Sequence, residues 1–210
     1  MTIFTTGFHL FSNAWFPLSG VESALWDLCG KAVGKPVVSL LGGTAHDRLT
    51  SYASGGMDSA LDEVRQEARN HLARGFQAVK IRAGVSATAD YAKAAAARDA
   101  LGAEAALAVD AVQGSNPNPW SAAQAIECGR LLEELDLLWF KEPCAATDVN
   151  EDAECDGRSI PIAGAESTTT IAEFQRFLDA DALDVAHRMP PILAACSRRA
   201  RRALSPRARA

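Results

Sequence analysis

The sequence contains no apolar run that approaches the roughly 20 residues needed for a membrane-spanning helix, although 48% of its 210 residues are hydrophobic. It also lacks a basic segment followed by a long apolar stretch near its start, so no signal peptide is expected. These two absences argue against a membrane protein. They predict a cytoplasmic location.

Cysteine is scarce and irregularly placed. The five cysteines include no CxxC pair; they are Cys29, Cys128, Cys144, Cys155 and Cys196. An odd number without paired spacing is not typical of a disulfide framework or of a structural zinc site. The thiols are therefore expected to be reduced and mostly packed.

Acidic residues are absent from the end of the chain. Residues 187–210 hold seven of the 21 basic residues and none of the 26 acidic ones. We interpret this segment as a basic irregular tail. Our hypothesis is that the abrupt change at His187 reflects a changed reading frame. The alternative is a genuine basic tail that binds nucleic acid or an acidic surface.

The chain before its middle has one clear helix signal. Residues 1–18 lack a pattern and are expected to be irregular. Ser19 and Glu22 are spaced as a capping box, which predicts that a helix begins there. Gly34 and Pro36 predict its end.

Short apolar runs that end in charged residues recur through the middle of the chain, with helix-like segments between them. The runs are 78–82, 107–110, 137–143 and 160–166, and further strands are expected at 49–53 and from Leu183. Apolar strands that alternate with helices predict a parallel sheet covered by helices. Intervals of about 30 residues are typical of a TIM-type β/α barrel, whose chemistry lies at the carboxyl ends of its strands.

The charges at these strand ends are placed to converge. Residues two apart share a strand face, so Lys80 and Arg82 point the same way. Asp110 and Glu166 end later strands, and neighbouring carboxylates are oxygen ligands that suit Mg²⁺. Cations beside them can act as acids or bases. For each residue alone, the alternative is a loop start or a helix cap.

Several motifs carry a resemblance to a known family. They include ALWDL at 24–28, LLGG at 40–43, VKIR at 79–82, VDA at 109–111, EP at 142–143 and GAES at 164–167. In this order and spacing, the chain resembles the mandelate racemase and muconate lactonizing enzyme family of the enolase superfamily. The resemblance covers residues 20–186.

The resemblance implies a (β/α)₇β barrel, here incomplete with about six strands. It implies a Mg²⁺ held by three carboxylates at the ends of strands three, four and five, and a base that removes the proton beside a substrate carboxylate. Asp110 and Glu166 match the first and third ligands, and Lys80 and Arg82 match the catalytic cationic pair. The implied function is a sugar-acid (aldonate or aldarate) dehydratase or racemase that acts on a small-molecule carboxylic acid.

One departure from the family pattern concerns the metal ligands. Lys141 stands where the family has the second carboxylate ligand. A unit charge about 4 Å away contributes on the order of 4 kcal/mol at an effective dielectric of 20, so the affinity for Mg²⁺ is expected to fall by several kcal/mol. Alternatively, Lys141 pairs with Asp110 and Glu166 and fills the site without metal. Either way, the predicted enzyme is impaired.

The expected domains follow from the same comparison. Residues 1–48 are expected to be a remnant of the capping domain and its connecting helix, 49–186 a partial enolase-type barrel, and 187–210 the basic tail. An open barrel leaves two sheet edges unpaired, so self-association into a homo-oligomer is expected. The alternative function is a non-catalytic barrel fragment that acts only through self-association.

Overall fold

The computed structural model of the chain describes residues 7–43, 47–56, 59–149, 159–168 and 171–187. The chain forms two compact units. The larger unit consists of Thr50–Glu166 and Arg176–His187, and the smaller one takes in Ser167–Gln175 and the described residues before Thr50. The charged strand ends singled out above all belong to the larger unit. The basic tail at 188–210, and with it the reading-frame hypothesis, lies outside the described residues.

The larger unit is built on a six-stranded parallel sheet. Its strands follow the chain in the order β1-β2-β3-β4-β5-β6, and each neighbouring pair is parallel. They are β1 (Ala53–Gly55), β2 (Ala78–Arg82), β3 (Ala106–Asp110), β4 (Leu137–Lys141), β5 (Ile162–Gly164) and β6 (Val185–Ala186). The predicted α/β fold with about six parallel strands is confirmed. Among the described residues, β1 and β6 form the two edges.

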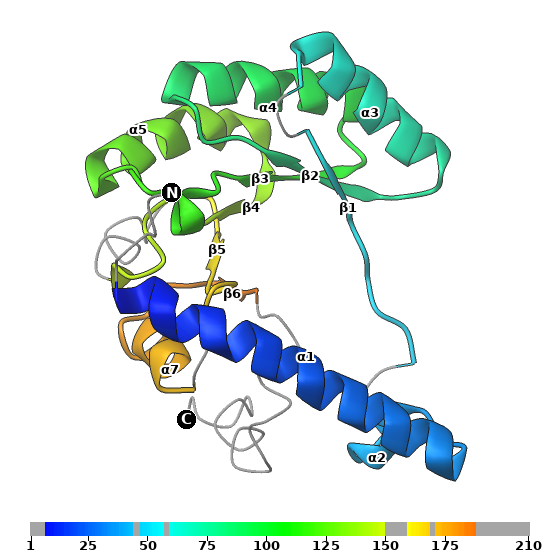
Figure 1. Cartoon of the computed structure of the whole chain (residues 1–210). Helices are drawn as coiled ribbons and strands as arrows, with labels where there is room; N and C mark the ends of the chain where they lie inside the picture. The colour runs from blue at the N-terminus through cyan, green and yellow to red at the C-terminus, as the bar shows by residue number, and fades with distance from the viewer. Residues whose placement is uncertain (1–6, 44–46, 57–58, 150–158, 169–170, 188–210) are drawn as a thin grey trace, which may run out of the picture. The chain divides into compact units, whose positions relative to one another are not determined.

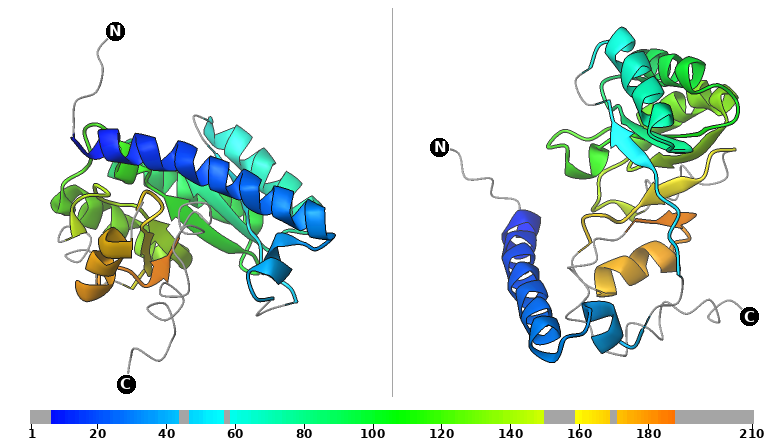
Figure 2. Two further views of the ribbon diagram at one scale, coloured as in Figure 1. Left: turned by 60° about the horizontal axis from the view of Figure 1, so that its bottom comes forward. Right: turned by 90° about the vertical axis from the view of Figure 1, so that its right-hand side faces the viewer.

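Helices connect these strands and cover one face of the sheet. They are α3 (Leu61–Ala73), α4 (Ala87–Leu101) and α5 (Ala122–Leu132), with short 3₁₀ turns η1 (Gln113–Ser115) and η2 (Glu133–Leu135), and α7 (Ile171–Asp179) before β6. α4 packs against both α3 and α5. Figure 1 shows these three helices along the same face of β1–β4, and the right-hand view of Figure 2 shows them grouped together on that side.

The hydrophobic core fills the space between the helices and the sheet. Alternate strand residues contribute to it, among them Val79, Ile81, Leu107, Val109 and Phe140. Successive strand side chains point to opposite faces. The residues between them therefore point away from the helices, to what we call the inner face. The charged strand residues lie there.

A β-bulge sets which residue of β4 faces the inner side. Leu107 pairs with Leu137, whereas Val109 pairs with Phe140, so β4 holds one residue more than β3 between these pairs. Bulges of this kind re-aim the side chains that follow them. Beyond the bulge, Asp110 pairs with Lys141.

The smaller unit contains α1 (Gly7–Val33) and α2 (Val37–Leu40). The predicted irregular lead-in at 1–18 is wrong from Gly7 onward, and Ser19 lies inside α1 rather than at its start. The reason is visible in the sequence: apolar residues at 8, 11, 15 and 18 continue backward the helical spacing that begins again at Val21.

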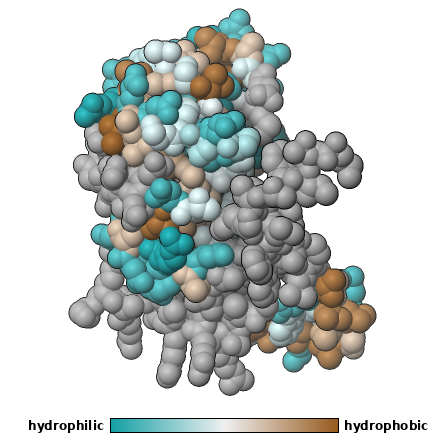
Figure 3. Space-filling view, turned by 60° about the vertical axis from the view of Figure 1, so that its left-hand side comes forward, coloured by the Kyte–Doolittle hydropathy of each residue, from teal (hydrophilic) through white to brown (hydrophobic). Residues whose placement is uncertain are grey.

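The predicted end of this helix is confirmed. Gly34 has a φ of 65°, the left-handed conformation that glycine adopts without steric cost. The Lys35 amide donates to the Gly30 carbonyl at 2.9 Å, which is the long bond of a Schellman motif. Figure 3 shows hydrophobic residues gathered around this end of α1 and α2; the exposed ones include Val21, Leu25, Leu28 and Val38. No helix in the described part of the chain has the length and apolar character of a membrane span.

Candidate functional site

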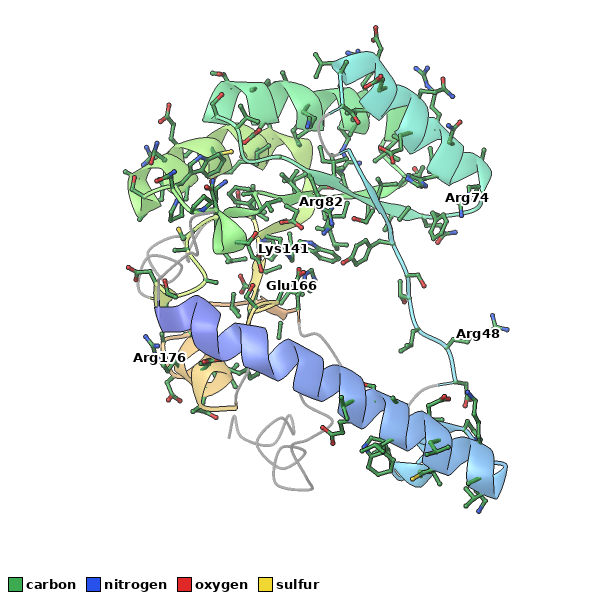
Figure 4. All side chains as sticks on the ribbon, in the orientation of Figure 1. Arg48, Arg74, Arg82, Lys141, Glu166 and Arg176 are labelled. Carbon is green, nitrogen blue, oxygen red and sulfur yellow. The ribbon has the colours of Figure 1, made fainter. Side chains whose placement is uncertain are left out.

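Strand register brings the predicted site residues to one end of the sheet. Arg82 of β2 lies opposite Asp110 of β3, and Asp110 lies opposite Lys141 of β4. Lys80 is two residues before Arg82 on the same strand face, and Glu166 follows the end of β5. Figure 4 shows Arg82, Lys141 and Glu166 on the side of the sheet away from α3, α4 and α5.

Asp110 is the anion that two lysines share. Its Oδ2 accepts hydrogen bonds from Lys80 Nζ at 2.5 Å and from Lys141 Nζ at 3.2 Å, and its Oδ1 accepts from the Val112 amide at 3.1 Å. Burial alone would raise the pKa of Asp110. The positive charges of Lys141 and Lys80, with their hydrogen bonds, outweigh burial and lower that pKa below its usual value. The carboxylate is therefore held in its charged form.

Lys141 is surrounded by three carboxylates. Its Nζ lies 2.7 Å from Glu166 Oε2, 3.2 Å from Asp110 Oδ2 and 3.4 Å from Glu142 Oε2. Burial alone would lower the pKa of Lys141, but the charges of Glu142, Asp110 and Glu166 raise it. Only 3% of the Lys141 side chain is exposed, and Figure 4 shows Lys141 and Glu166 close together. The pairing that the sequence analysis offered as an alternative is the arrangement in the structure.

Glu142 is a buried carboxyl group on a constrained backbone. Its φ is 47°, a region that few residues other than glycine occupy. Its Oε1 is buried without a hydrogen-bond partner among the described residues. Burial raises the pKa of Glu142 above its ordinary value, and the nearby charge of Lys141 only partly opposes this. The ionised form of Glu142 is thus less favourable in the folded protein than in the unfolded chain.

We expect the Glu142→Gln variant to be at least as stable as the wild type at pH 7. A raised pKa means that the folded state retains the proton more strongly, so stability is full below the ordinary pKa and declines as the pH rises through the raised one. The amide cannot ionise and escapes this decline. Urea unfolding of both proteins from pH 4 to 8 checks the expectation. A variant that is less stable than the wild type at pH 7 contradicts it.

Three aromatic rings adjoin the charged cluster, and sequence reasoning did not bring them together. Tyr52 precedes β1, Trp139 belongs to β4, and His187 follows β6. The Trp139 ring lies 5.4 Å from that of Tyr52 and 5.0 Å from that of His187, measured between centroids. Burial, and then the charge of Lys141, lowers the pKa of His187. The available signal was the two-residue spacing of Trp139 and Lys141, which places both on the inner face.

Gln113 is a second residue that the sequence analysis left unassigned. It is almost fully buried, and its Nε2 donates to the carbonyls of Ala111 at 2.7 Å and Gly84 at 3.3 Å. Its Oε1 accepts from the Trp120 amide at 3.0 Å, and its own amide donates to the Glu142 carbonyl at 3.0 Å. Gln113 thus ties together the segments that follow β2, β3 and β4, next to the charged cluster.

The donors present do not fit a magnesium ion. Mg²⁺ requires oxygens at about 2.1 Å in octahedral geometry, whereas Asp110 and Glu166 both direct an oxygen to the Lys141 ammonium. Within the described residues, no group of three or more His, Cys, Asp or Glu side chains is arranged to hold a metal. The predicted ligand pair is brought together, but around a side-chain cation.

Comparison with known proteins assigns the chain to a family. Residues 63–190 match the family model described as enolase C-terminal domain-like. Arabinonate dehydratase of Saccharolobus solfataricus is 33% identical over 173 residues, which is 80% of this chain and 45% of that protein.

Solved structures are also similar to this chain. The 3,6-anhydro-D-galactonate cycloisomerase from Zobellia galactanivorans superimposes with a TM-score of 0.74 at 31% identity, over 81% of this chain and 47% of its own. L-Talarate dehydratase from Polaromonas sp. JS666, complexed with Mg and L-glucarate, gives a TM-score of 0.70 at 30% identity, over 80% of this chain and 46% of its own. The chain thus spans about half the length of the relatives it matches.

Proposed function

Because the chain belongs to the enolase C-terminal domain-like family, we propose that its strand-end cluster is the proton-abstraction site of a sugar-acid dehydratase or racemase, in a form with strongly reduced turnover. The substrate class is a small carboxylic acid of the aldonate or aldarate type. This proposal is supported by relatives whose names specify sugar-acid dehydratases and cycloisomerases. The domain assignments, with 1–48 as a capping-domain remnant and 49–186 as a partial barrel, belong to the same proposal.

The observation that carries the proposal is the position of Lys80. Lys80 lies two residues before the carboxyl end of β2. Its side chain is 7% exposed, and its Nζ contacts Asp110 Oδ2 of the next strand at 2.5 Å. In the proposed reaction, Lys80 accepts the proton from the carbon beside the substrate carboxylate, and the C–H electron pair moves into the carboxylate to form an enediolate. Lys141 and Arg82 supply positive charge at the same strand ends.

The same contacts explain why turnover should be slow. An ammonium group that donates to Asp110 cannot accept a proton until it has released its own. The three carboxylates around Lys141 occupy its donors, since a lysine ammonium has three. Neither cation is therefore free to meet a substrate carboxylate without losing a buried partner. That loss costs several kcal/mol by the usual magnitude for buried ion pairs.

Exchange of the α-proton with solvent deuterium tests the function without requiring complete turnover. Incubation with a set of aldonic and aldaric acids in D₂O, followed by NMR, is expected to reveal slow exchange for at least one acid. Replacing Lys80 by methionine should reduce the exchange rate by about a hundredfold, the low end of the usual contribution of a general base. Lys80→Arg should be equally slow, because arginine keeps the charge but does not deprotonate.

Lys31→Met provides the matched control. Lys31 forms an exposed ion pair with Asp27 on α1, with 75% of its side chain exposed, so its replacement should leave the exchange rate unchanged. Exchange by the wild type that persists in Lys80→Met would contradict the role of Lys80. Absence of exchange for every acid would contradict the proposed function itself.

A further inference from the structure

The charged cluster contains a cation that belongs to the protein. Three carboxylates, from the ends of β3, β4 and β5, direct an oxygen to one nitrogen, Lys141 Nζ, at 2.7–3.4 Å. The three donors of an ammonium match three acceptors. We propose that Lys141 is a resident cation that takes the place of a divalent ion between Asp110 and Glu166, so that the wild-type site does not bind Mg²⁺.

Burial makes this arrangement more than a surface ion pair. The exposed fractions of the Lys141 and Asp110 side chains are 3% and 4%. Exposed ion pairs are worth little because water screens them, whereas a charge at these two positions needs a partner in the folded protein. Glu166 is 47% exposed, so solvent reaches the cluster at this residue. The Lys141 ammonium is therefore a buried charge with a buried carboxylate partner, not a charge on the solvated surface.

The local backbone also directs Lys141 to this point. The bulge in β4 places Lys141 directly opposite Asp110, and the Ala111 amide donates to the Lys141 carbonyl at 2.8 Å. The Glu142 amide donates to the Ala163 carbonyl, also at 2.8 Å. Hydrogen bonds on both sides thus fix the strand where the side chain leaves it. Because the backbone is fixed on both sides, an ion could enter only if the Lys141 ammonium left its three carboxylates.

Electrostatics decides between the two cations. A divalent ion beside the ammonium would be repelled by it, because two positive charges a few ångströms apart in a buried site are only weakly screened. Removing the ammonium removes that repulsion, and a glutamate in its place adds a fourth carboxylate. The single substitution Lys141→Glu should therefore convert a site that excludes Mg²⁺ into a site made of oxygen ligands.

Direct metal binding tests the inference. Titration of the full chain with Mn²⁺, followed by electron paramagnetic resonance of the free ion, and with Mg²⁺, followed by calorimetry, should show no saturable binding to the wild type. The Lys141→Glu variant should bind both ions at least about 100-fold more tightly. The double variant Lys141→Glu/Asp110→Asn should lose that gain, which places the ion at this cluster.

A second measurement covers the case in which Lys141→Glu folds poorly. Without its central cation, the variant should gain thermal stability when Mg²⁺ is added, while the melting temperature of the wild type stays constant. Saturable Mg²⁺ or Mn²⁺ binding by the wild type that is lost in Asp110→Asn would overturn the proposal. So would a Lys141→Glu variant that folds and shows neither binding nor stabilisation. None of these readouts depends on the proposed enzymatic function, so the two proposals can fail separately.

Discussion

Replacing Lys141 by methionine is expected to lower the free energy of unfolding by about 3 kcal/mol at pH 7 in metal-free buffer. Methionine approximates the length of the side chain but leaves Asp110, Glu142 and Glu166 without the cation that they share. Removing one partner from a buried ion pair usually costs about 3–5 kcal/mol, because the remaining charge stays buried. The lower end applies here because Glu166 is half-exposed and can turn to solvent.

The loss should shrink as the pH falls. Protonation of the carboxylates removes the repulsion between them, and Glu142 accepts a proton first because burial already raises its pKa. Urea unfolding at pH 7 and at pH 4.5, in the presence of EDTA, measures both values. Lys31→Met, which breaks an exposed pair, should change stability by less than about 1 kcal/mol. A Lys141→Met protein as stable as this control would show that the cluster does not hold the fold.

Replacing Asp110 by asparagine is the other change with a large expected effect, again about 3–5 kcal/mol at pH 7. Asparagine has the same shape but no charge, and it leaves two buried ammonium groups without the carboxylate between them. Lys80 is affected most, because Asp110 is its partner across the strands and only 7% of its side chain is exposed. Chemical unfolding at pH 7 measures the loss.

The pH dependence of this loss identifies its cause. The lysines lower the pKa of Asp110, so its contribution to stability is present above the ordinary Asp pKa of about 3.9 and is lost as the pH falls through the lowered value. The difference between wild type and Asp110→Asn should therefore be constant from pH 8 to about pH 5 and diminish under acid. A difference that stays the same down to pH 2 would point to packing rather than charge.

The sheet could be predicted because its determinants are local. Each strand is a short apolar run, each crossover contains one helix, and period-two alternation assigns Lys80 and Arg82 to one face without knowledge of the tertiary structure. The convergence of Asp110, Lys141 and Glu166 followed from the rule that parallel strands end at the same edge. These parts of the site depend on strand order, which the spacing of the runs already contains.

The remaining features depend on contacts between distant segments. Gln113 stabilises three loops through hydrogen bonds to backbone groups, and backbone groups look alike in every sequence. The aromatic rings of Tyr52, Trp139 and His187 come from segments that lie more than 40 residues apart in the sequence. Strict alternation along the strand would place Glu142 on the face opposite Lys141, but Glu142 follows the last residue of β4 with a left-handed φ, and its carboxylate reaches Lys141. A two-residue repeat cannot predict a residue that has left the strand.

The start of α1 was missed for a different reason. A capping box inside a longer helix has the same sequence as one at its beginning, so Ser19 and Glu22 could not distinguish the two. The apolar spacing that continues back to residue 8 was the better guide, since helix length is set by the extent of the periodic face rather than by one capping signal.

The bulge in β4 makes the site depend on how the strand is paired as well as on which residues it contains. The strand carries one residue more than its neighbour between Leu137 and Phe140, and the bulge that absorbs this residue keeps Lys141 beside Asp110. A regular ladder through the same residues would instead pair Phe140 with Asp110, with an apolar ring where a charge now lies. The charge balance at the end of the sheet therefore depends on one irregularity of the backbone as much as on the identity of one amino acid.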